Sequence, residues 1–218
     1  MRNLLTILCI CSLAMFMSCK GKNANTVEAT AAEEVSKEMS GESFSVNVAG
    51  SSISWVGSKP GKDHSGTLAL SDGMLTVDNG NITGGTFSID MNSLKNTDLA
   101  GTEGAGKLEG HLKSEDFFNV MKFPNAKFTI TKVTKVLNNP NMSHSVSGNL
   151  EMMGISKNIT MPATIKIEDG VVNASISEFA LNRTDWGVKY GSGLIGTALD
   201  KAISDDVQID ITLNANKS

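Results

Sequence analysis

Alternation of apolar and polar residues is the feature that most constrains the fold of this chain. The clearest case is segment 206–213, where valine, isoleucine or leucine stands at every odd position and aspartate, glutamine or threonine at every even one. Successive side chains of a strand point to opposite faces, so such a segment has one dry face and one wet face. The same pattern recurs along the chain, in 44–48, 53–55, 68–70, 75–77, 87–91, 128–136, 146–152, 159–167 and 172–181.

These segments predict an all-β architecture of about eight to ten antiparallel strands. Gly73 and the cluster Asp78-Asn79-Gly80 supply turn residues between the early strands. Two stretches, 98–120 and 190–203, interrupt the alternation and predict one or two short helices or loops at the ends of the sheet. A closed antiparallel barrel accounts for the pattern best because closure removes exposed edge strands, and a sandwich remains the alternative.

The first 18 residues are typical of a secretory signal peptide, with Arg2 ahead of an apolar tract that is too short to span a membrane. Phe16-Met17-Ser18-Cys19 resembles a lipobox, which predicts cleavage before Cys19 and acylation of its thiol. The alternative is an ordinary secretory leader. We expect an exported protein that is lipid-anchored in the cell envelope, at the outer membrane and facing the periplasm. The three cysteines end at Cys19, so the mature chain has none left for a disulfide or a metal site.

Domain boundaries follow from composition. Residues 19–41 are mostly small, polar or charged and predict a flexible tether after the acylated cysteine, whereas 42–216 predict one domain with a sizeable core. The chain carries 23 acidic and 19 basic residues, a net charge of −4, which argues against a nucleic-acid partner.

Five blocks in this order resemble the YceI-like family, over residues 44–214: Trp55–Lys59 with His64 and Gly66, Phe87–Leu94, Leu112–Val120 with Phe123–Phe128, Gly148–Lys157, and Arg183–Gly187. Trp186 stands where the family usually carries phenylalanine. The resemblance implies a lipocalin-like barrel that binds polyisoprenoid or related lipids in an apolar tunnel. It therefore implies an isoprenoid-type lipid or isoprenoid quinone as the partner. The physiological role does not follow from the resemblance, and our own expectation is a carrier or reservoir without bond chemistry.

An interior of about eight strands is wide enough either to be filled by its own side chains or to hold one small ligand. Met91, Met152 and Met161 fall in strands where pliable side chains suit an apolar guest. We expect the lipid to be lined by apolar residues of the strands and of the first insertion: Trp55, Phe87, Ile89, Leu108, Leu112, Phe117, Phe118, Phe128, Leu150, Met152, Ile176 and Phe179.

Three cations are candidates for a polar head group. Lys59 and His64 flank a Pro-Gly turn, and the guanidinium of Arg183 can grip a phosphate, although pairing of Arg183 with Asp185 or a neighbouring strand gives it a structural role instead. Asp205 and Asp206 begin the last strand and are expected to be solvated.

No catalytic, metal or cofactor signature accompanies these cations. The three histidines are far apart in sequence and neither HExxH nor GxSxG occurs, so we expect no enzyme, no cofactor and no metal. The competing interpretation is a solid barrel that acts as a structural or interaction module, for which Val133, expected to face outward, is the supporting residue. The sequence leaves open whether two barrels pair as a homodimer.

Overall fold

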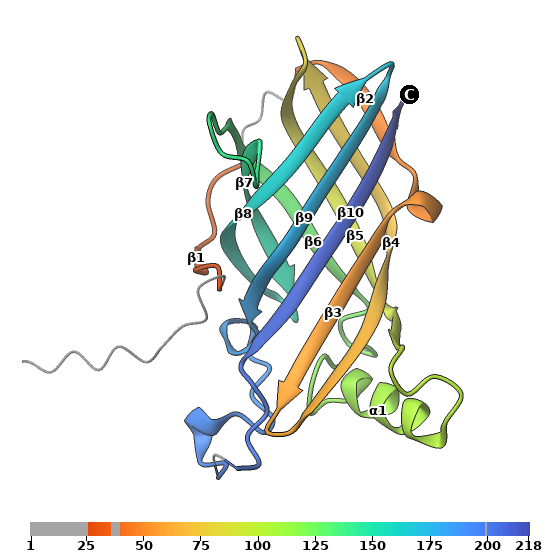
Figure 1. Ribbon diagram of the computed structural model, residues 1–218, viewed down its shortest axis with the longest axis vertical. Helices are drawn as coiled ribbons and strands as arrows, with labels where there is room; N and C mark the ends of the chain where they lie inside the picture. The colour runs from red at the N-terminus through yellow and green to blue at the C-terminus, as the bar shows by residue number, and fades with distance from the viewer. Residues whose placement is uncertain (1–25, 36–39, 199) are drawn as a thin grey trace, which may run out of the picture.

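The computed structural model describes residues 26–35, 40–198 and 200–218 (Figure 1). The predicted signal peptide 1–18 and the predicted acylation site Cys19 lie outside the described residues. Within these ranges, no helix has the length and apolar character needed to cross a membrane.

The described residues form ten strands and one α-helix. The strands are β1 (Thr30–Ala31), β2 (Glu42–Val46), β3 (Ser52–Lys59), β4 (Lys62–Asp78), β5 (Asn81–Asn96), β6 (Asn125–Lys135), β7 (His144–Met152), β8 (Ile155–Glu168), β9 (Val171–Asn182) and β10 (Asp206–Lys217). Helix α1 spans Glu103–Lys113, and three short 3-10 helices are η1 (Val48–Gly50), η2 (Arg183–Trp186) and η3 (Gly193–Ile195).

The strands form an antiparallel barrel, as the alternation predicts. Strands β4 to β8 pair in chain order, and β9 pairs with both β8 and β10, which returns the sheet on itself. Strands β2 and β3 share one position in the wall, because β2 pairs with one half of β10 and β4 while β3 pairs with the other half. The wall therefore has eight positions, the number at which an interior can just hold a small ligand.

Three two-residue hairpins set the register of long neighbouring strands. Asn79-Gly80, Met153-Gly154 and Asp169-Gly170 all have positive φ at both residues. Such turns match the right-handed twist of the flanking strands, and glycine adopts this conformation without steric cost. Only the first of the three was singled out from the sequence.

Gly73 is not a turn residue, contrary to the prediction. It lies inside β4, a single 17-residue strand that replaces two predicted short ones and has register shifts against β5 on the way. A Cβ on Gly73 would lie 2.7 Å from Cγ2 of Val46 and 3.0 Å from Cδ1 of Phe87. The glycine therefore serves the close approach of neighbouring side chains.

Val133 faces the interior, and the prediction that it points outward is wrong. A register shift between Ile130 and Lys132 inserts an irregularity into β6, after which Val133 pairs with Val146 of β7. A bulge of this kind moves every later side chain to the other face of the strand. The residue that supported an outward-acting module thus belongs to the core.

Both predicted insertions lie at one end of the barrel, at the bottom of Figure 1. The first contains α1, which begins at Glu103 and includes three glycines, Gly104, Gly106 and Gly110. A contact with β5 helps to stabilise this glycine-rich helix. Oε1 of Glu109 accepts a hydrogen bond of 2.9 Å from the backbone N–H of Asn96 at the end of β5. The second insertion, residues 183–205, connects β9 to β10. We call this end of the molecule the α1 end.

Residues 26–31 lie between β8 and β9 and bond to both strands, which differs from the flexible tether expected for 19–41. Thr30 and Ala31 pair with Asn158 and Lys157 of β8, and Val27 packs against buried core residues. The barrel supplies the apolar and hydrogen-bonding partners that composition alone does not provide for this segment.

Candidate functional site

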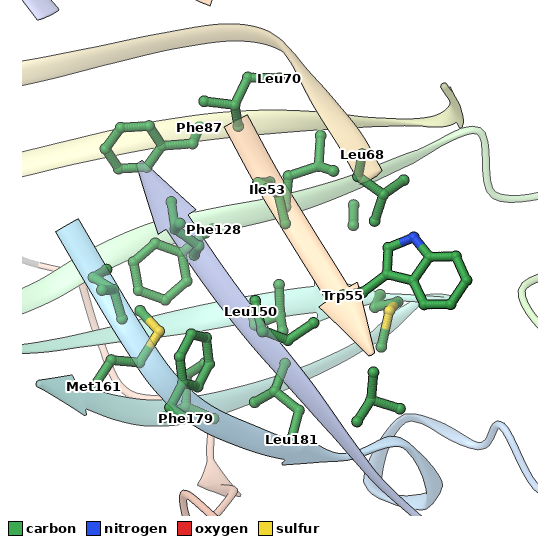
Figure 2. A pocket seen from close by; sticks show the side chains of 18 of the residues that line it. Ile53, Trp55, Leu68, Leu70, Phe87, Phe128, Leu150, Met161, Phe179 and Leu181 are labelled. Carbon is green, nitrogen blue, oxygen red and sulfur yellow. The ribbon is translucent and has the colours of Figure 1, made fainter. Parts of the chain in front are cut away.

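The barrel encloses a cavity of about 250 Å³. Figure 2 shows side chains from opposite walls converging on it, among them Ile53, Phe128, Leu150 and Phe179. Because one water molecule needs only about 10–15 Å³ measured in this way, the cavity has room for a ligand. The lining consists of aliphatic and aromatic residues, methionines and Gly57, together with two polar residues, Arg183 and Ser204. The interior is therefore hollow, which argues against the solid-barrel interpretation.

Most of the predicted lining residues meet at this cavity. Leu108 is the exception: it lies half-buried on α1, outside the lining. The structure brings together Trp55, Phe87, Ile89, Leu112, Phe117, Phe118, Phe128, Leu150, Met152, Ile176 and Phe179. Whether these residues bind a lipid stays a prediction.

Sequence reasoning missed many other lining residues. They include Ile53, Leu70, Ile130, Val146, Ile209 and Ile211, all at apolar positions of the alternating pattern. That signal was present, but alternation cannot separate a side chain that lines a cavity from one that fills a core. Met91, Met152 and Met161 do line the cavity, where their flexible side chains suit an irregular guest.

Two of the aromatic rings pack directly against glycines on neighbouring strands. Trp55 pairs in register with Gly66 of β4, and a Cβ on Gly66 would collide with the Trp55 indole and with the backbone oxygen of Lys95. A Cβ on Gly148 would likewise collide with the ring of Phe128. Both rings can lie flat against the wall because these two positions have no side chain, which leaves the interior open.

Trp55 also carries an unusual polar atom. Its Nε1 is buried and has no hydrogen-bond partner, the only such side-chain atom in the described part of the chain. Buried donors normally have partners, and one left unpaired costs about 1–3 kcal/mol. The atom lies within the wall and not on the cavity surface, so Trp55 presents its apolar ring to the cavity.

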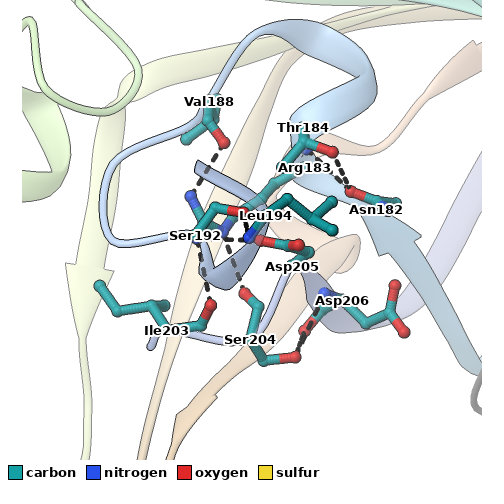
Figure 3. Close-up of polar contacts among 10 residues, drawn as sticks. All are labelled: Asn182, Arg183, Thr184, Val188, Ser192, Leu194, Ile203, Ser204, Asp205 and Asp206. Atoms are coloured by element: carbon teal, nitrogen blue, oxygen red, sulfur yellow. Dashed lines mark hydrogen bonds and ion pairs between the residues drawn. The ribbon is translucent and has the colours of Figure 1, made fainter. Parts of the chain in front are cut away.

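Arg183 is buried at the α1 end, with only 4% of its surface exposed (Figure 3). Its Nε donates to the backbone oxygen of Ser204 at 3.0 Å, and its two terminal nitrogens donate to the oxygens of Val188 at 2.8 Å and Ile203 at 3.3 Å. Its carboxylate partner is Asp205, at 3.4 Å, and not the neighbouring Asp185. Burial lowers the pKa of the guanidinium, and the charge of Asp205 opposes that effect.

These contacts give Arg183 a structural role, because most of its donors are committed to the segment that joins β9 to β10. They also correct the expectation that Asp205 and Asp206 are solvated. Asp205 bonds Arg183, and Oδ2 of Asp206 accepts a hydrogen bond of 3.0 Å from the hydroxyl of Thr26.

The other two head-group candidates, Lys59 and His64, lie in different surroundings on the β3–β4 hairpin. Lys59 is exposed at the tip of the β3–β4 hairpin, opposite Lys62, whereas His64 pairs in register with Gly57. Nδ1 of His64 lies 2.9 Å from Oδ2 of Asp98, whose other oxygen accepts a 2.9 Å bond from the N–H of Ser65. Chiefly the bond from Ser65, supported by His64 and Asn96, lowers the pKa of Asp98 to about 2. His64 is thus engaged by a carboxylate.

Aromatic residues close the α1 end of the cavity. The ring of His111 lies 5.0 Å from that of Phe117 and 4.7 Å from that of Tyr190, in edge-on geometry. Phe117 lines the cavity and lies under the guanidinium of Arg183, at 5.9 Å. This end is therefore held by ring contacts and by the Arg183 hydrogen bonds together.

Comparison with known proteins gives the same architecture. The family model of the YceI-like domain matches residues 44–215. Among curated proteins, Protein YceI of Salmonella arizonae is 32% identical over 104 residues, 48% of this chain and 46% of that protein. The match thus spans about half the length of these relatives.

Two solved structures share the fold at low sequence identity. BcnA of Burkholderia cenocepacia superposes with a TM-score of 0.62 at 20% identity, over 78% of this chain and 99% of that one. A polyisoprenoid binding domain from Saccharophagus degradans superposes with a TM-score of 0.59 at 16% identity, over 80% and 98%. Together with the family model, the barrel and its apolar cavity place this chain in the YceI-like domain family.

Proposed function

We propose that the protein binds one long-chain apolar lipid of the polyisoprenoid or isoprenoid-quinone type inside its barrel, as a non-enzymatic carrier or reservoir of the cell envelope. The cavity is the observation that carries this proposal. Its apolar lining lets an apolar guest remove hydrocarbon surface from water, at about 25 cal/mol per Å² buried. The structural neighbour from Saccharophagus degradans is described as a polyisoprenoid binding domain, which supports the ligand class.

The cavity surface is apolar along its whole length and suits the hydrocarbon chain of the proposed lipid. Arg183 and Ser204 lie at the α1 end of the lining and are hydrogen-bonded within the protein. We place the polar head group of the lipid at this end, beside the polar segment that joins β9 to β10. We propose that an acylated Cys19 anchors the protein at a membrane.

Native mass spectrometry tests the proposal. We expect protein purified without detergent from a bacterial envelope to carry about one lipid per chain, held in the barrel cavity. Solvent extraction of the sample then identifies the released compound. A mass without ligand that stays unchanged after incubation with membrane extract would contradict lipid binding.

A further inference from the structure

Strands β8 and β9 are neighbours in the barrel wall but pair along only part of their length. The two strands pair only from Thr164–Ser175 to Glu168–Val171, at the end away from α1. Residues 155–163 of β8 pair with β7, and residues 176–182 of β9 pair with β10, but in the described part of the chain these two halves do not pair with each other. We call the gap between them the seam.

Residues 26–31, here called the strap, occupy the seam. Thr26 forms a parallel bridge with Ala180 of β9, and the N–H of Val27 donates to the oxygen of Ala180 at 3.0 Å. At its other end, the strap pairs antiparallel with Asn158 and Lys157 of β8. The strap is thus a short strand inserted between two strands that diverge, and Figure 1 shows it at that edge of the barrel.

The inward side chains of the strap support the cavity wall. Val27 and Ala29 pack against a cluster of Leu150, Ile159, Met161, Phe179 and Trp186. The first four members of this cluster also line the cavity. Removing the strap would therefore expose the back of the cavity lining to solvent.

The strap and the residues that follow it are held mainly by hydrogen bonds at exposed or half-buried positions, among them the bond from the hydroxyl of Thr26 to Oδ2 of Asp206. Oδ1 of Asn149 accepts from the N–H of Glu33 at 3.0 Å, and Nδ2 of Asn149 donates to the oxygen of Glu33 at 2.7 Å, both at exposed positions. Segments with little buried apolar surface and exposed hydrogen bonds open at low free energy. The α1 end is built differently, because the buried Arg183 network and the ring contacts fix it.

We propose that the strap is a removable part of the barrel wall, that Val27 and Ala29 are lipid-retaining residues, and that the lipid enters and leaves through the seam when the strap lifts. This inference rests on the proposed function. It concerns residues outside the matched YceI-like domain, which begins at residue 44. The proposed anchor Cys19 precedes Thr26 by seven positions, so the seam lies within about 25 Å of the membrane that holds the lipid.

A reversible crosslink tests the route. Ala31 and Lys157 are partners in register, a geometry that suits a disulfide, so the double variant A31C/K157C locks the strap when oxidised. We expect oxidation to slow transfer of all-trans-retinol from the mature protein to phosphatidylethanolamine–phosphatidylglycerol vesicles by at least about tenfold, because the local opening is blocked. Reduction restores the rate. The control S147C/T160C joins β7 and β8, which already pair, and leaves the rate unchanged.

A point variant tests the retaining role from the opposite direction. Val27→Asp places a charge in the apolar cluster and is expected to speed retinol release about tenfold, with the barrel still folded by circular dichroism. The control Ala32→Asp adds the same charge at an exposed position. Equal rates for oxidised and reduced A31C/K157C, or for Val27→Asp and the parent, would overturn the seam route. Absence of retinol binding by the reduced protein would instead count against the proposed function.

Discussion

Replacing Leu150 with tryptophan is expected to abolish lipid loading and to leave the barrel folded. Leu150 lies on β7 in the middle of the cavity wall, only 7% exposed, and its side chain points at the hollow (Figure 2). The added ring volume therefore enters free space instead of a packed core, so the cost of overpacking stays near the lower end of its usual range, about 1 kcal/mol. Met152→Trp places the same ring two residues along the strand and is expected to act in the same way.

Lipid stoichiometry by native mass spectrometry checks this result, with circular dichroism as the measure of folding. Leu137→Trp is the matched control, because Leu137 is 81% exposed and does not line the cavity. We expect that variant to load like the parent. Normal loading of the Leu150 variant would remove this residue from the binding site and would place the lipid elsewhere.

Replacing Arg183 with methionine is expected to lower the free energy of unfolding by about 3–5 kcal/mol, the usual result of removing one partner from a buried charged network. The change leaves three backbone oxygens and the carboxylate of Asp205 without their donor. Single domains are stable by only about 5–15 kcal/mol, so the effect is a large part of the total. Urea unfolding at neutral pH measures it.

Two further variants are controls for the unfolding measurement. Adding Asp205→Asn to Arg183→Met is expected to recover part of the loss, because the carboxylate that lost its partner becomes neutral. Lys166→Met breaks an exposed ion pair with Glu168 and is expected to change stability by less than about 1 kcal/mol. A stable Arg183→Met protein with weakened lipid binding would show instead that Arg183 holds a head group.

The sequence by itself determined the architecture. Alternation predicted the strands and their dry face, and that face proved to carry most of the residues around the cavity, from Trp55 on β3 to Phe179 on β9. This succeeds because the two-residue period of a strand is a local property that a short segment shows on its own. The five sequence blocks then identified the family, which the family model confirmed.

The tertiary structure decided what depends on residues far apart in the chain. Only the assembled wall shows a hollow interior, in which Gly57 and Ala163 leave room and Gly66 lets the Trp55 indole lie flat. A bulge in β6 turned Val133 inward, against the local pattern. Arg183 acquired its role from carbonyls some twenty positions away, and the strap found its partners on β8 and β9. Packing, cavities and buried polar contacts arise between segments that meet only after folding. The alternation of apolar and polar residues along one segment therefore cannot predict them.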